Sequence, residues 1–139
     1  MATDDDYRAL LRFRTRLREF DQWSRGEAEQ RGLTHAQHQL MLAIRGFGKP
    51  QGPTIGDVAE LLLVKHHTAG ELVDRTQALG FVERVRDADD HRRVRLRLTE
   101  RGQEVLHQLT DVHLAEVKRL APLFPFIDGG EGPAPDRRG

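Results

Sequence analysis

The chain has 139 residues, no cysteine, and 22 basic residues against 22 acidic ones, so its formal net charge is zero. This length fits one domain with one hydrophobic core. The lack of cysteine excludes disulfides, thiolate zinc sites and thiol-based redox sensing. No apolar run approaches the roughly 20 residues that cross a bilayer, and the N-terminus has no secretory leader pattern. We therefore expect a cytoplasmic protein without a membrane partner.

The N-terminal third predicts two helices and a loop. Apolar residues recur every three or four positions over Tyr7–Arg31, which predicts a long helix with one apolar face. Gly32 ends this helix, and Thr34 is a suitable N-cap for a second one. The glycines and prolines of Gly46–Pro53 then predict a loop.

The middle of the chain predicts a helix-turn-helix over about residues 54–79. Thr54–Leu62 has the pattern of a short helix, Leu63–Lys65 forms a tight connection, and His66–Leu79 has the pattern of a longer helix. In DNA-binding proteins with this motif, the second helix lies in the major groove.

A basic β-hairpin is predicted directly after the second of these helices. Apolar and charged residues alternate along Val82–Arg86 and along Val94–Leu98, as in half-buried strands, and a loop joins the two segments. Between Arg84 and Arg101 there are seven basic residues against four acidic ones, a local excess of three positive charges. A helix followed by such a hairpin, here about residues 81–98, is a winged helix, for which DNA is the obvious polyanionic partner.

The C-terminal part predicts one more long helix and a tail. Thr99 is a suitable N-cap for this helix, and Pro122 ends it. We expect one domain over residues 1–128 and a disordered tail over residues 129–139, where glycine and proline dominate. The expected fold is mainly α with a small β-wing, and the long N- and C-terminal helices form a dimer interface.

Two motifs resemble the MarR family of bacterial transcriptional regulators. The first is DHRR at Asp90–Arg93, followed by LT at Leu98–Thr99 and by Gly102, and it is similar to the wing signature of that family. The second is LVDR at Leu72–Arg75 followed by LGFV at Leu79–Val82. The resemblance extends over about residues 10–120. It implies a homodimer that binds a pseudo-palindromic site on double-stranded DNA, commonly as a repressor that a small molecule releases.

The resemblance and the predicted elements select candidate DNA-binding residues. Residues at the start of the second helix of a helix-turn-helix face base edges or phosphates. By the resemblance, Asp90 holds Arg92 for insertion into the minor groove, where a narrow A·T-rich segment attracts a guanidinium. The full candidate set is Lys65, His66, His67, Thr68, Arg75, Arg86, Asp90, Arg92 and Arg93. Arg84, Arg95 and Arg97 are divided between phosphate contact and a solvated strand face.

Aromatic and histidine side chains define two further hypotheses. Phe13, Phe20, Trp23 and Met41 are candidates for lining a small-molecule pocket between the dimer helices and the winged domain, although aromatic residues at helical spacing are more often core. Zinc needs three or four converging ligands. We instead expect His35, His38, His107 and His113 to be scattered over the surface, with no metal site and no cofactor.

The sequence gives no indication of catalysis. It has one serine outside any nucleophile-elbow motif, no cysteine and no glycine-rich phosphate loop, so we expect that the protein is not an enzyme. The alternative to a DNA-binding regulator is a winged-helix protein-interaction or scaffold dimer without a specific DNA site. The zero net charge favours this alternative, as do Gly70 and Glu71, which occupy helix positions where the family commonly has a hydroxyl residue and a base.

Overall fold

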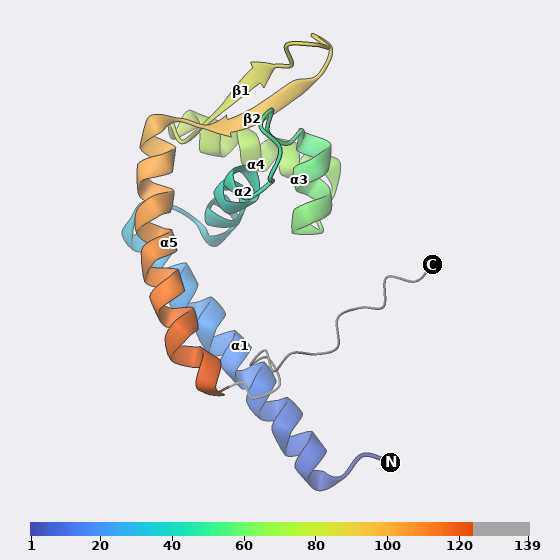
Figure 1. Ribbon diagram of the computed structural model, residues 1–139, viewed down its shortest axis with the longest axis vertical. Helices are drawn as coiled ribbons and strands as arrows, with labels where there is room; N and C mark the ends of the chain where they lie inside the picture. The colour runs from blue at the N-terminus through green and yellow to red at the C-terminus, as the bar shows by residue number, and fades with distance from the viewer. Residues whose placement is uncertain (124–139) are drawn as a thin grey trace.

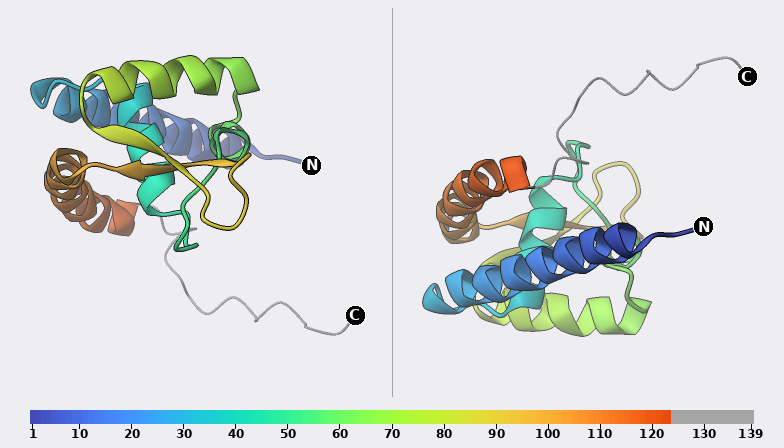
Figure 2. Two further views of the ribbon diagram at one scale, coloured as in Figure 1. Left: turned by 90° about the horizontal axis from the view of Figure 1, so that it is seen from above. Right: turned by 90° about the horizontal axis from the view of Figure 1, so that it is seen from below.

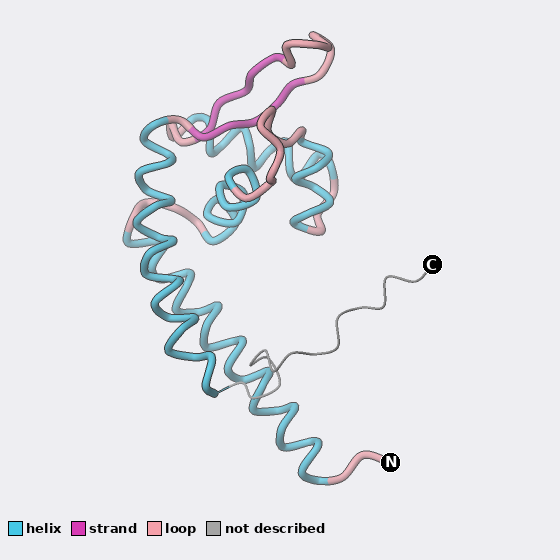
Figure 3. Tube along the Cα trace, in the orientation of Figure 1, coloured by secondary structure: helices cyan, strands magenta, loops and turns pink. Residues whose placement is uncertain are grey.

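The computed structural model describes residues 1–123, and the predicted tail at 129–139 lies outside this range. Its elements are shown in Figures 1 and 3 and are, in order, α1 (Asp4–Gln30), α2 (His35–Arg45), α3 (Ile55–Leu62), α4 (His66–Ala78), β1 (Val82–Arg86), β2 (Val94–Leu98), α5 (Glu100–Leu120) and the 3₁₀ turn η1 (Ala121–Leu123). This arrangement confirms the predicted fold class. Both strands have the predicted bounds.

Threonine caps fix where four of the helices begin. The side chains of Thr3, Thr34, Thr54 and Thr99 each accept a hydrogen bond from the backbone N–H three residues later, which satisfies a donor that a helix start leaves open. The caps predicted at Thr34 and Thr99 are confirmed. The prediction that the first helix begins at Tyr7 is wrong, because Thr3 and Asp6 form a capping box and the acidic residues Asp4–Asp6 suit the positive end of the helix dipole.

One hydrophobic core lies under the wing. It is built from α2, α3, α4, the hairpin and the start of α5, with Leu40, Met41, Leu96 and Leu109 fully buried. The inner face of α4 contributes Ala69, Val73 and Thr76. Because this face is inward, the opposite face of α4 is directed to solvent.

The wing is a two-stranded antiparallel sheet in which Val82 pairs with Leu98 and Arg86 pairs with Val94. The backbone N–H of Leu96 also donates to the carbonyl oxygen of Pro53 at 2.8 Å. The loop before α3 is therefore fixed against the outer edge of β2.

Two long helices extend away from the winged body. In Figure 1, α1 and α5 leave it in the same direction, and Figure 2 shows α1 passing beneath α2 and α4. Several large apolar side chains on these helices are exposed: Tyr7, Leu10, Leu11, Leu17, Leu114 and Val117. Within the described residues, no helix is both long and apolar enough to span a bilayer.

Candidate nucleic-acid interface

The start of α4 presents polar side chains without partners. The chain reverses direction at Leu63, whose backbone is left-handed (φ 56°), and α4 then begins after Lys65. Lys65, which is the N-cap residue, makes no side-chain capping bond, so it leaves the first backbone N–H groups of α4 open. The residues Lys65, His66, His67 and Thr68 are all exposed. None of the four uses its side chain in a hydrogen bond or ion pair within residues 1–123.

The tip of the wing is held in one conformation by Asp87. Its carboxylate accepts hydrogen bonds from Nε of Arg95 at 2.8 Å, and from the backbone N–H groups of Asp89 and Asp90 at 2.8 and 3.0 Å. The Arg95 hydrogen bond, followed by those of the two backbone groups, lowers the pKa of Asp87 to about 2. This carboxylate is therefore ionised at neutral pH, and the loop that it organises keeps its shape.

Asp90 directs an arginine outward from this tip. One carboxylate oxygen of Asp90 accepts from the backbone N–H of Arg92 at 3.1 Å and from its Nε at 3.4 Å. The Arg92 side chain is nevertheless 94% exposed, so its terminal nitrogens face solvent. Arg93 lies 4.0 Å from the other oxygen of Asp90, and Arg86 donates to the carbonyl oxygen of His91 at 2.8 Å.

The other hairpin arginines are paired inside the chain. Arg84 donates to Asp74 at 2.7 Å and also to Gln77, which ties β1 to α4. Arg97 donates to Glu83, its direct cross-strand neighbour, at 2.6 Å. Both arginines, like Arg95, therefore have acidic partners within the chain. Of these pairs, the sequence offered a signal only for Glu83 and Arg97, through the hairpin register.

The outer face of α4 also carries Arg75 and Glu71, both exposed and without a side-chain partner in the described part of the chain. Together with the N-terminal residues of α4 and the wing tip, Arg75 completes the predicted set. The structure thus brings Lys65–Thr68 and Arg75 onto one helix, and Arg86, Asp90, Arg92 and Arg93 onto one loop and strand end. Their neighbours Asp87, Arg84 and Arg95, which position the wing, were missing from the predicted set.

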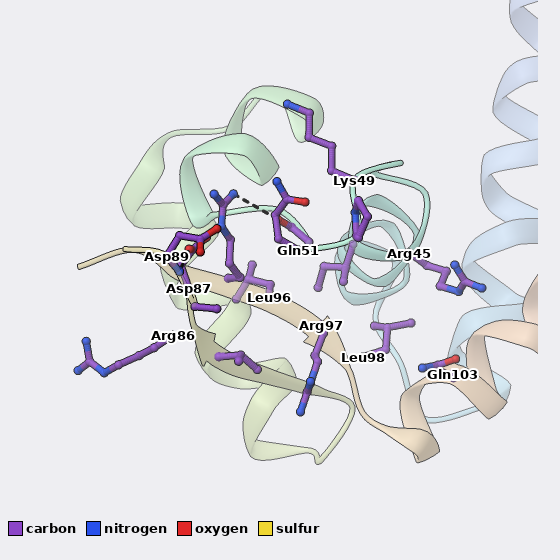
Figure 4. Close-up of a pocket in the computed structure, with 16 residues that line it drawn as sticks. Arg45, Lys49, Gln51, Arg86, Asp87, Asp89, Leu96, Arg97, Leu98 and Gln103 are labelled. Atoms are coloured by element: carbon purple, nitrogen blue, oxygen red, sulfur yellow. Dashed lines mark hydrogen bonds and ion pairs between the residues drawn. The ribbon is translucent and has the colours of Figure 1, made fainter. Parts of the chain in front are cut away.

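A groove of about 780 Å³ lies between the end of α2, the loop before α3 and the wing. Arg95 is among the lining residues and donates to the carbonyl oxygen of Gly52 at 3.3 Å. The Arg86 side chain points away from the groove (Figure 4). Both signs of charge line the groove. None of the four residues predicted for a ligand pocket contributes to it.

Two of those four residues, Phe20 and Trp23, lie instead where α1 meets α5. The rings of Phe20 and Trp23 are 6.0 and 4.8 Å from the ring of His113, measured between centroids. Phe13 is half-buried on the same helix, whereas Met41 is fully buried in the core. The ligand-pocket hypothesis stays a prediction.

The expectation that all four histidines are scattered over the surface is wrong for two of them. His38 is 3% exposed, and its ring centroid lies 4.8 Å from that of His113. Nδ1 of His113 donates to the carbonyl oxygen of Leu109 at 2.6 Å, so in the neutral ring Nε2 accepts from the Ser24 hydroxyl at 2.7 Å. Residues 24 and 113 are distant in sequence, and only the packing of three helices brings them together. Across residues 1–123, no three metal-binding side chains gather in one place.

A short helix, a tight turn, a second helix with a free outer face, and an antiparallel hairpin with arginines at its tip define a winged helix-turn-helix protein. Residues 31–93 of the chain match the sequence profile of the MarR family. The match extends from α2 to the wing loop, within the part of the chain whose motifs resemble the same family.

Solved structures share the fold. MepR, a transcription regulator of the Staphylococcus aureus multidrug efflux pump MepA, is 22% identical with a TM-score of 0.70 over 80% of each chain. Apo MarR from E. coli is 22% identical with a TM-score of 0.66, over 83% of this chain and 90% of that one. A MepR mutant bound to an oligodeoxyribonucleotide is 23% identical, with a TM-score of 0.66 over 79% of each chain. No curated protein sequence matches the chain.

Proposed function

We propose that this protein is a DNA-binding transcription regulator that inserts α4 into the major groove and the wing tip into the adjacent minor groove. One observation carries the proposal. The unpartnered residues Lys65–Thr68 begin α4 at the same end of the molecule as the wing tip (Figure 2, left), where Asp90 directs Arg92 into solvent. Both groups can thus contact one duplex. A MepR mutant of the same fold is bound to an oligodeoxyribonucleotide.

The side chains suggest that some residues contact bases and others contact phosphates of the duplex. Lysine and histidine can donate to guanine or to phosphate, and the Thr68 methyl group can contact a thymine methyl group. Arg75, Arg86 and Arg93 carry charges without sequence preference, which suits phosphate contacts. Arg92 is the residue for the minor groove. Specificity then comes from the start of α4, and much of the affinity from the arginines.

Substituting Arg92 by alanine is expected to weaken DNA binding by about 1–3 kcal/mol. The reason is that the exposed guanidinium contributes charge to DNA while it makes only a solvent-exposed contact inside the chain. Fluorescence anisotropy with a labelled duplex from the region upstream of the encoding gene, titrated against salt and unrelated competitor DNA, measures the change. Arg12→Ala, on the exposed face of α1, is the matched control and should bind like the unchanged protein.

Equal affinity of the Arg92 and Arg12 variants would refute the role of the wing. Weak binding of the unchanged protein, displaced equally by any DNA, would favour the alternative of a protein-interaction or scaffold dimer. In that case, a set of random duplexes enriched by binding would decide whether an operator exists elsewhere in the genome.

We further propose that the protein is a homodimer joined through α1 and α5. Tyr7, Leu10, Leu11 and Leu17 lie on one face of α1 by their spacing, and all four are exposed. An apolar face of this extent on a helix that extends from the body suits a second copy of the chain. Two copies related by a two-fold axis would hold their α4 helices about 34–36 Å apart and select a pseudo-palindromic operator.

Substituting Leu17 by aspartate is expected to convert the dimer to a monomer, because a carboxylate in an apolar interface would lose its hydration without gaining a partner. Light scattering coupled to size-exclusion chromatography measures the mass, with Arg12→Asp as the control on the opposite face of α1. A dimeric Leu17 variant, or an unchanged protein that is already monomeric, would contradict the proposed interface. Loss of the dimer should also weaken binding to a two-half-site duplex.

Regulation by a small molecule completes the proposal. Phe13, Phe20, Trp23 and Met41 are our candidates for the effector pocket, and an effector bound there would favour a spacing of the two α4 helices that does not fit DNA. Release of a repressor in the cytoplasm is the outcome that we expect. An effector should lower DNA affinity in the same anisotropy assay, and one that leaves it unchanged at saturation would count against this mechanism.

A further inference from the structure

Gly70 lies in the interior of α4, although the fold does not require glycine there. Its backbone φ is not positive, and a Cβ built on it would meet no heavy atom within 4 Å. Glycine in a helix interior is less stable than alanine because it loses more backbone entropy on folding. Neither conformation nor packing within the described residues accounts for a glycine here, which points to a contact with another molecule.

The position of Gly70 on α4 follows from its neighbours at helical spacing. Asp74 and Gln77 are four and seven residues later, so they share one face of the helix with Gly70. Both accept hydrogen bonds from Arg84 of β1. Gly70 therefore lies on the side of α4 that faces the wing, one turn closer to the N-terminus than the Arg84 contact.

The same face continues to His66, one turn before Gly70. A ring carbon of His66 lies 4.0 Å from the position that a Cβ of Gly56, at the start of α3, would occupy. We call the surface formed by His66, Gly70 and Arg84 the wing-side notch, because Gly70 carries no side chain there. The wing tip lies on the same side of the molecule as the N-terminal half of α4 (Figure 2, left).

The geometry of a DNA duplex indicates which part of it would lie against this surface. A sugar–phosphate strand separates each major groove from the neighbouring minor groove. If α4 occupies the major groove and Arg92 reaches the adjacent minor groove, one strand has to pass between the helix and the wing. A side chain at position 70 would project toward that strand.

We propose that the wing-side notch holds one sugar–phosphate strand of the bound duplex. Gly70 lets the strand approach the α4 backbone closely, and Arg84 supplies a positive charge beside it. Asp74 and Gln77 hold the guanidinium of Arg84 in place before DNA binds. This inference rests on the proposed DNA-binding function and adds to it the path of one strand over the protein.

Gly70→Ala tests the notch because it should move stability and affinity in opposite directions. Alanine favours the helix and meets nothing in the free protein, so the thermal midpoint should rise by about 2–8 °C. The added methyl group should hold the strand away and raise Kd for the duplex about tenfold, the size of one lost hydrogen bond to a charged group. Gly26→Ala is the matched control, since Gly26 also lies in a helix interior with no atom within 4 Å of its Cβ position. It should raise the midpoint and leave Kd unchanged.

Each outcome decides the matter. A stabilised Gly70 variant with unchanged Kd would overturn the notch and leave the proposed function intact. A destabilised variant would mean that Gly70 has a packing role, and it would also overturn the notch. Absence of DNA binding by the unchanged protein would remove the proposed function and the notch together. Arg84→Gln provides a second test, because a lost phosphate contact should lower the slope of log Kd against log salt by about one, which a purely structural role would not do.

Discussion

Gly102→Ala is expected to destabilise the protein by about 3 kcal/mol or more, at the upper end of what an added core methyl group costs. A Cβ on Gly102 would lie 2.1 Å from the carbonyl oxygen of Phe81 and 3.0 Å from its carbonyl carbon. Backbone atoms at these distances cannot move aside as the end of a flexible side chain can. Equilibrium unfolding in urea, followed by circular dichroism, measures the loss.

The close contact between Gly102 and Phe81 joins the end of the wing to its start. The Phe81 carbonyl oxygen accepts from the backbone N–H of Thr99 at 3.0 Å, and the Thr99 hydroxyl donates to the carbonyl oxygen of Gly80 at 2.7 Å. The same hydroxyl accepts from the N–H of Gly102 at 3.0 Å. The Leu-Thr-x-x-Gly pattern is thus a junction of wing and helix, and its glycine is needed for space.

Gly26→Ala serves again as the control, since the same substitution there meets open space. A Gly102 variant that unfolds at the same urea concentration as the unchanged protein would show that the α5 start can shift away from Phe81 without cost. If Gly102→Ala lowers the free energy of unfolding strongly and Gly26→Ala raises it, the effect at Gly102 is steric and does not come from helix propensity.

The elements that local sequence determines were predicted well. Alternation along Val82–Arg86 and Val94–Leu98 gave both strand bounds, and the caps at Thr34 and Thr99 were found from residue type. The start of α1 was missed because the acidic run before Tyr7 lacks apolar periodicity, although its chemistry suits a first helical turn.

In the candidate site, too, contacts between residues close in sequence were predictable, and contacts between separate elements were not. The Asp90–Arg92 contact spans two residues, so a local motif predicts it. Arg84 contacts Asp74 on another element, and His113 contacts Ser24, 89 residues away. Such pairs depend on how helices and strands pack, for which the period of a single segment gives no information. The candidate DNA-binding residues were therefore easier to predict from the sequence than the residues that position them.

Acidification from pH 6.5 to about 4 is expected to lower the free energy of unfolding through His38. Burial, followed by the electrostatic effect of His113 and His35, lowers the pKa of His38 from 6.5 to about 4. The folded protein thus keeps this ring neutral, whereas the unfolded chain binds a proton below pH 6.5. The stabilisation is fully present above pH 6.5 and is lost as the pH falls toward 4, with a slope of at most about 1.4 kcal/mol per pH unit.

The surroundings of His38 explain why its protonated form is unfavourable. Its Nδ1 is buried without a hydrogen-bond partner in the described part of the chain. The neighbours of the His38–His113 ring pair include Phe20, Trp23 and Ser24 from α1 and His35 from α2. None of these is a carboxylate that could neutralise an imidazolium, so protonation favours separation of the three helices.

His38→Phe keeps a flat ring against His113 and cannot bind a proton, so urea unfolding between pH 7 and 4 should show a shallower pH dependence. His107→Gln, an exposed position on α5, is the control and should keep the slope of the unchanged protein. Nuclear magnetic resonance of the His38 ring in the unchanged protein gives an independent reading if the variant folds poorly. A ring that titrates near pH 6.5, or a phenylalanine variant with the full slope, would contradict the assignment. Because the pair lies where α1 and α5 meet the winged body, acid should loosen the link between the proposed dimer helices and α4 before it unfolds the wing.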